Sequence, residues 1–176
     1  MSDHASPTIA ELLSMPHAVA LDAGSSNRAA GDRLRGLDAA RLFAPVPVRD
    51  PDMARACLSG LWLRFDFLDE SHRISQELPS AEGSFWHAIM HRREGDYGNS
   101  KYWWRRVGRH PVFGPLAEQA EQLGVTRGGD WDPFGFVDEV EACMTRQRGG
   151  EAALRSVQGR EWQLLFDYCC RQATEA

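Results

Sequence analysis

The chain has 176 residues, 43% of them hydrophobic and 26% charged, and a formal net charge of −5. These values are typical of one globular domain, and they exclude a disordered chain, a fibrous repeat and an integral membrane protein. The acidic total also argues against a surface that is basic overall, as nucleic-acid binding would require.

The first 49 residues differ from the rest in aromatic content. All six Trp, all three Tyr and all but one of the eight Phe lie after residue 50, and the exception is Phe43. Because large aromatic side chains dominate the burial of a core, we predict an N-terminal arm or covering segment over 1–49 and a helical core domain over 50–176. Within the arm, Ser6-Pro7 predicts the start of a helix, and the polar, glycine-containing stretch 22–36 predicts a loop.

Capping residues and prolines predict a series of helices in the core domain. The predicted helices begin at or just after Asp50, Asp69, Ser80, Asn99, Pro115, Asp132 and Glu151. Asp38 predicts one further turn through Phe43, and no segment alternates apolar and polar residues as a half-buried strand would. The sequence therefore predicts an all-α fold, a compact single-domain bundle of about six to eight helices with an N-terminal arm.

The cysteines and the N-terminus bear on the cellular compartment. The four cysteines form no CxxC or zinc-ribbon spacing, and two of them, Cys169 and Cys170, are adjacent. The first 24 residues contain neither a basic start nor an uninterrupted apolar segment. We therefore expect reduced, buried cysteines and a cytoplasmic protein with no membrane partner.

Two histidines share one face of the helix predicted over 81–94. His87 and His91 are four residues apart, so their side chains point in similar directions, and Glu94 returns to the same face. This spacing lets two imidazoles bind one ion. It predicts a metal site made by His87, His91 and Glu94, with His72 as a further ligand and a divalent metal such as zinc as cofactor.

Two other interpretations of this face remain open. The face can be a solvated polar surface, as amphipathic helices commonly have. It can also line a metal-free pocket, in which His72, His87 and His91 are the candidate catalytic residues. A histidine near its ordinary pKa of ~6.5 can act there as a general acid or base.

Two arginines on the same helix need partners if they are buried. Arg92 and Arg93 project toward the flanks and the apolar side, where a guanidinium requires a carboxylate or a carbonyl. The candidate acidic partners are Asp66, Asp69, Glu70, Glu77 and Glu82. Alternatively, Arg92, Arg93, Tyr102 and Arg105 hold an anionic small molecule. We thus expect a ligand-binding pocket or an active site between the helices of residues 69–107, with no reaction assigned.

A rival hypothesis uses the aromatic residues. Trp103, Trp104 and Trp131 would then form a surface for a protein partner or for a second copy of the chain, since Trp, Tyr and Arg are typical interface residues. Basic and aromatic residues alternate between His91 and Pro111, a pattern that can also bind nucleic acid. The net negative charge of the chain makes nucleic acid the weaker alternative.

The run FWHAIMHRREGDYGNSKYWWRRVGRHP resembles a segment of an uncharacterised bacterial and fungal protein family of unknown function. The resemblance covers about residues 60–112. It implies that this segment belongs to a family, and it implies no catalytic assignment.

Overall fold

The computed structural model describes residues 6–126, 128–146 and 149–175. Within these residues the chain forms ten helices and no strand, so the predicted all-α class is confirmed and the helices are more numerous than the six to eight expected. The helices are α1 (Pro7–Ser14), α2 (Arg28–Leu34), α3 (Ala39–Phe43), α4 (Pro51–Arg64), α5 (Leu68–Ser75), α6 (Ala81–Glu94), α7 (Tyr97–Val107), α8 (Phe113–Gln122), α9 (Pro133–Arg146) and α10 (Glu151–Thr174).

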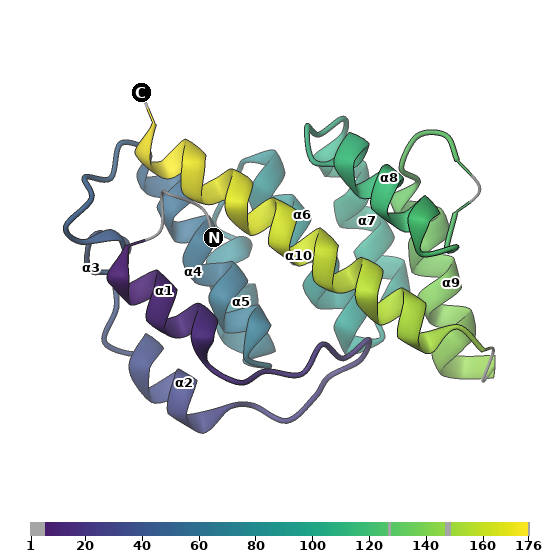
Figure 1. The fold of residues 1–176 in the computed structure, drawn as a ribbon, viewed down its shortest axis with the longest axis horizontal. Helices are drawn as coiled ribbons and strands as arrows, with labels where there is room; N and C mark the ends of the chain where they lie inside the picture. The colour runs from purple at the N-terminus through teal and green to yellow at the C-terminus, as the bar shows by residue number, and fades with distance from the viewer. Residues whose placement is uncertain (1–5, 127, 147–148, 176) are drawn as a thin grey trace.

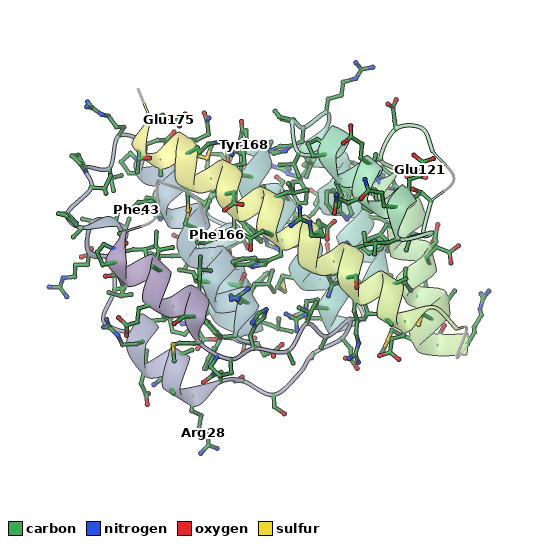
Figure 2. The ribbon with its side chains drawn as sticks, in the orientation of Figure 1. Arg28, Phe43, Glu121, Phe166, Tyr168 and Glu175 are labelled. Carbon is green, nitrogen blue, oxygen red and sulfur yellow. The ribbon has the colours of Figure 1, made fainter. Side chains whose placement is uncertain are left out.

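Two helices organise the bundle. Helix α10 crosses the molecule from the end formed by α8 and α9 to the end where α3 lies (Figure 1). Helix α6 packs against α4, α5 and α7. In the core, Phe43 and Phe166 are almost completely buried, whereas Arg28 and Glu121 lie on the surface (Figure 2). The candidate catalytic, metal-binding and ligand-binding residues lie on α5, α6 and α7, and most of them are on α6.

The N-terminal segment is a helical layer that contributes to the core. Ile9 and Leu12 of α1 are fully buried in the same apolar cluster as α4 and α6. The prediction of a loop over 22–36 is wrong for residues 28–34, which form α2. Asn27 begins this helix by accepting a hydrogen bond from the backbone of Ala30. Gly31 lies so close to Phe67 that a Cβ atom there would come within 2.4 Å of the ring.

Local capping explains the ends of α6 and the start of α7. Ser80 accepts a hydrogen bond from the Gly83 backbone, and Gly95 ends α6 in the left-handed conformation with φ of 82°. Helix α7 begins earlier than predicted. Asp96, and not Asn99, is its N-cap, and its side chain accepts from the backbone N–H of Asn99 at 3.0 Å.

Helix α6 is buried on nearly all sides, from Glu82 through Arg93. Its predicted polar face is therefore not a solvated surface. Trp86 fits against α4 where Gly60 has no side chain, and a Cβ atom at Gly60 would lie 2.7 Å from the Trp86 ring. The polar residues of α6 must consequently find partners inside the protein.

The remaining compositional predictions concern cysteines and membranes. All four cysteines are free and buried. Among the described residues, none of the helices is long and apolar enough to cross a membrane.

Candidate metal centre

Three histidines, one on α5 and two on α6, lie close together where these helices pack. His72 of α5 and His87 and His91 of α6 place one potential ligand atom each within 4.8 Å of the others. Their ring centroids are 4.5 Å apart for His72 and His87, 4.7 Å for His87 and His91, and 5.4 Å for His72 and His91. The structure thus brings together the three histidines that the sequence proposed as catalytic residues or ligands. We call them the histidine cluster.

A short connection between α5 and α6 sets this geometry. The two helices pack together, with only five residues, 76–80, between them. Gly83 permits a close approach, because a Cβ atom there would lie 2.5 Å from the carbonyl oxygen of Leu78. His87 and His91, one helical turn apart, therefore face the turn of α5 that carries His72.

Hydrogen bonds fix the orientation of the His87 ring. The Ser75 hydroxyl donates to the His72 carbonyl at 3.2 Å, and its oxygen lies 3.3 Å from Nδ1 of His87. We assign the serine proton to the His72 carbonyl, and with this assignment the serine oxygen accepts from the Nδ1–H of His87. Trp103 stacks on the same imidazole with centroids 3.8 Å apart and planes 24° apart. Nε2 of His87 is then the atom that carries the free lone pair.

Hydrogen bonds also fix the orientation of the His91 ring. Its Nδ1 lies 3.0 Å from a carboxylate oxygen of Glu94, which can only accept. Its Nε2 lies 3.2 Å from the Asn99 amide nitrogen, which donates. His91 therefore carries its proton on Nδ1 and its lone pair on Nε2, as His87 does.

Burial keeps the two α6 histidines neutral. His87 is 2% exposed and His91 is 7% exposed. Burial is the main cause that lowers the pKa of His87 to about 3, and the neighbouring His91 and His72 contribute to this shift in the same direction. Burial also lowers the pKa of His91, although the Glu94 carboxylate opposes the shift. Neutral imidazole is the form that binds a metal ion.

The dimensions of the cluster suit a transition metal. Zinc binds histidine nitrogen at about 2.0–2.1 Å, so two nitrogens of a tetrahedral site lie about 3.3 Å apart. The present separations are at most 4.8 Å, so the ligand atoms would have to move closer together to hold one tetrahedral ion. His72 and Trp103 are only half-buried, so the cluster is accessible from solvent on their side.

Glu94 occupies a different place from the one predicted. It lies outside the group of three convergent ligand atoms and binds Nδ1 of His91 instead. A carboxylate at this position orients a ligating imidazole and increases its basicity. The structure therefore places Glu94 behind His91, in contact with Nδ1 of the ring.

Arg92 points away from the histidine cluster toward α10. It is fully buried, forms a bidentate ion pair with Glu161, and donates to the Gln158 side chain at 3.1 Å. Its guanidinium also lies 4.7 Å from the Phe136 ring centroid. Burial raises the pKa of Glu161, and the charge of Arg92 opposes that shift. None of the five acidic partners considered from the sequence is Glu161.

Arg93 is also held by internal partners. It forms an ion pair with Asp66, one of the predicted partners, and donates to the carbonyls of Leu63 at 2.8 Å and Asp22 at 3.1 Å. The structure therefore does not bring Arg92 and Arg93 to the histidines.

The other two predicted ligand-binding residues lie on the surface of α7. Tyr102 is 48% exposed and meets Trp103 edge-on, and Arg105 is exposed beside a cavity of about 860 Å³ between α7, α8 and the segment before α9. Their anion-binding role stays a prediction. Of the tryptophans considered for an interface, Trp104 and Trp131 are 2% and 5% exposed, so an aromatic surface there would contain chiefly Tyr102 and part of Trp103.

Sequence reasoning missed three residues that position the histidines, namely Ser75, Asn99 and Trp103. Helical spacing contains a signal for them: Ser75 follows His72 by three residues, and Trp103 follows Asn99 by four. Each pair therefore lies on one face of its helix.

Comparison with known proteins adds no functional assignment, because no family model, no curated protein and no solved structure matches the chain. The resemblance over residues 60–112 stays a prediction.

Proposed function

We propose that the protein binds one divalent transition metal ion, with zinc as the first candidate, through His72, His87 and His91. The observation that carries this proposal is the convergence of three imidazoles, two of which hold their Nδ1 protons in hydrogen bonds to Ser75 and Glu94. Metal-binding histidines characteristically use their second nitrogen in this way.

The arrangement of lone pairs supports a cation between the rings. The Nε2 atoms of His87 and His91 are both acceptors, and two acceptors that face one another repel unless a donor or a cation lies between them. The Asn99 amide donates to His91 only, and the single N–H of a neutral His72 is the other donor close to these two acceptors. A metal ion would satisfy all three rings and replace the Asn99 contact at His91.

Three histidine ligands favour a reactive centre over a purely structural one. Structural zinc sites usually have four protein ligands, whereas catalytic sites have three and leave one position for water or substrate. A bound divalent ion lowers the pKa of its water to about 7 and attracts anionic groups. The proposed function is therefore a metal-dependent site between α5, α6 and α7 that takes up water or a small anionic ligand. The free cysteines support a reducing compartment such as the cytoplasm.

Calorimetric titration of the untagged, chelator-treated chain with ZnCl₂ tests this function. We expect one ion per chain, and a loss of affinity of at least about 100-fold in His87→Ala/His91→Ala. The half-buried His72 allows a gentler variant, His72→Ala, which should also weaken binding. His17→Ala, at an exposed histidine away from the cluster, is the matched control.

Circular dichroism verifies that each variant is folded. Absence of zinc binding by the native chain, or undiminished binding in folded His72→Ala and His87→Ala/His91→Ala, would overturn the proposal.

A further inference from the structure

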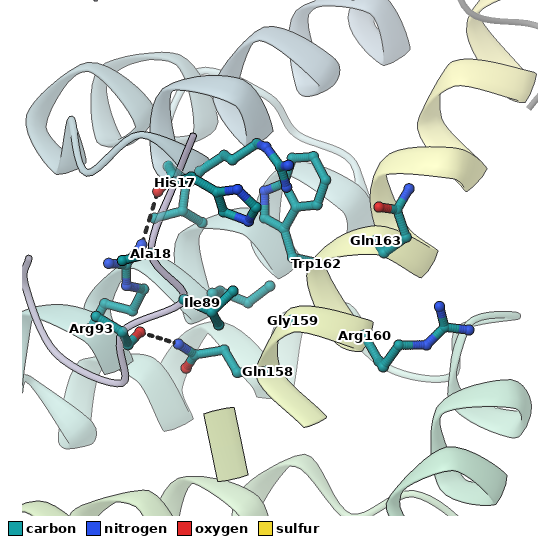
Figure 3. Close-up of a pocket in the computed structure, with 13 residues that line it drawn as sticks. His17, Ala18, Ile89, Arg93, Gln158, Gly159, Arg160, Trp162 and Gln163 are labelled. Atoms are coloured by element: carbon teal, nitrogen blue, oxygen red, sulfur yellow. Dashed lines mark hydrogen bonds between the residues drawn. The ribbon is translucent and has the colours of Figure 1, made fainter. Parts of the chain in front are cut away.

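A second candidate site lies where α6 faces α4 and α10. It is a cavity of about 250 Å³ between these three helices and the N-terminal segment 17–20 (Figure 3). The histidine cluster does not contribute to it. Ile89 and Arg93 of α6 line the cavity, while His87 and His91 of the same helix form the histidine cluster.

The lining combines positive charge with apolar surface. Three arginines line the cavity, Arg64, Arg93 and Arg160, and none of the described lining residues is a carboxylate. Asp66 lies behind the lining, paired with Arg93. The apolar part of the wall consists of Ala18, Val19, Ala20, Leu63, Ile89 and Trp162. Such a lining fits a ligand with an anionic group and an apolar body.

Arg64 is the arginine with unused hydrogen-bonding capacity. Its Nε is buried and has no partner among the described residues, and one terminal nitrogen donates to the Leu13 carbonyl at 3.2 Å. The guanidinium lies 4.8 Å from the Trp162 ring centroid. Burial lowers the pKa of Arg64 to about 10, so the side chain stays protonated at neutral pH. A buried donor without an acceptor is costly, and a ligand oxygen would satisfy it.

Arg93 is different, because the structure already provides its acceptors. It binds Asp66 and the carbonyls of Leu63 and Asp22. Arg160 is exposed at the rim. Of the three cations, Arg64 is therefore the one with a buried nitrogen, Nε, that has no acceptor among the described residues.

The N-terminal segment covers the cavity and is attached to its walls. Gln158 of α10, a wall residue, donates to the Ala20 carbonyl (Figure 3). Outside the lining, Asn27 donates to the Pro16 carbonyl at 2.8 Å. Three of its four residues, Ala18, Val19 and Ala20, have small side chains and leave the cavity unfilled. A wall that is held in place in the free protein lowers the entropic cost of binding.

We propose that this cavity binds a small monocarboxylate with an aromatic or branched apolar body. The carboxylate accepts from Nε of Arg64, and the body lies against Ile89, Trp162 and Val19. The volume is slightly below the usual range for small-molecule sites, which limits the ligand to roughly a dozen non-hydrogen atoms. The guanidinium suits a planar carboxylate because its donors form a planar fork.

Binding of 3-phenylpropionate to the full chain tests the proposal. Isothermal titration gives the affinity, and the NMR signal of the Trp162 indole reports whether the probe occupies this cavity. We expect a dissociation constant below about 1 mM. The neutral amide of the same acid should bind at least about tenfold more weakly, because it lacks the charge that Arg64 recognises. Inorganic phosphate, which has no apolar body, should also bind more weakly.

Two variants test the charge of Arg64 and the volume of the cavity separately. Arg64→Gln removes the anchor and should weaken binding at least about tenfold. Val19→Trp fills the cavity without changing charge and should abolish binding. Arg41→Gln, at an exposed arginine of α3, removes the same charge elsewhere and should leave the affinity unchanged.

Several results would overturn the proposal: no binding of 3-phenylpropionate at millimolar concentration, equal binding of the amide or of phosphate, or unchanged affinity in folded Arg64→Gln or Val19→Trp. The titration is done with metal-free protein, so the outcome is independent of the histidine cluster.

Discussion

The buried polar groups of α6 fall into two classes that differ in how completely the protein satisfies them. Arg92 and Arg93 direct their guanidinium groups to carboxylates and carbonyls of the same chain. His87 uses only Nδ1 in this way, whereas His91 contacts both Glu94 and Asn99, and both rings lie close to His72. A buried group whose bonds are all internal contributes to the fold, whereas a buried group with an unused lone pair or donor is a candidate to bind a ligand.

The largest expected effect is at Arg92, a buried group whose partners are all within the protein. Arg92→Met leaves the Glu161 carboxylate buried without its cation, so we expect the free energy of unfolding to fall by about 3–5 kcal/mol. Urea denaturation measures the change. The exposed substitution Arg105→Met should change it by less than about 0.5 kcal/mol. A loss of stability in Arg92→Met no greater than that in Arg105→Met would contradict the structural role of Arg92.

A smaller effect is expected at the carboxylate behind His91. Glu94→Gln keeps the size of the side chain and removes the charge that orients the imidazole, so zinc affinity should fall by about 10–100-fold. Glu77→Gln is the matched control, because Glu77 is a surface carboxylate paired with Arg55. Equal zinc affinities of the two variants would show that Glu94 does not support a ligand.

A further expected effect is a pH dependence of the stability of the metal-free protein. The pKa of His87 is lowered to about 3 in the folded state from 6.5, so the unfolded chain binds the additional proton. The contribution of neutral His87 to the free energy of unfolding should be fully present above pH 6.5. The free energy of unfolding should then decrease as the pH falls from 6.5 toward 3, by at most about 1.4 kcal/mol per pH unit from this residue.

Urea denaturation between pH 7.5 and 4.5 measures that slope. His87→Gln retains a polar side chain but cannot titrate, so its slope below pH 6.5 should be shallower than that of the native chain. An equal slope in the two proteins would show that His87 is not held neutral by the fold.

Local patterns were sufficient to predict the helix that carries the site. Ser80 and Gly95 mark the ends of α6, and the spacing of His87 and His91 places both on one face. Helix α2 was not predictable in this way, because its segment is polar and its few apolar residues are buried by tertiary contacts such as that of Gly31 with Phe67. Propensity over seven residues is too weak a signal for such a helix.

The partners of buried charges were the hardest feature to predict. Arg92 and Glu161 are 69 residues apart, and nothing near either residue in the sequence indicates the other. The cavity around Arg64 combines residues of α4, α6, α10 and the N-terminal segment, so its composition emerges only when these elements pack. The histidine cluster was easier to predict from the sequence, because two of its members belong to one helix.

X-ray absorption spectroscopy of the zinc-loaded, untagged chain tests the three-histidine centre most directly. The spectrum should show three imidazole nitrogens at about 2.0 Å and no sulfur, and His72→Ala should lose one of the three. A sulfur ligand at about 2.3 Å would mean that buried cysteines bind the metal, and it would contradict the assignment to His72, His87 and His91.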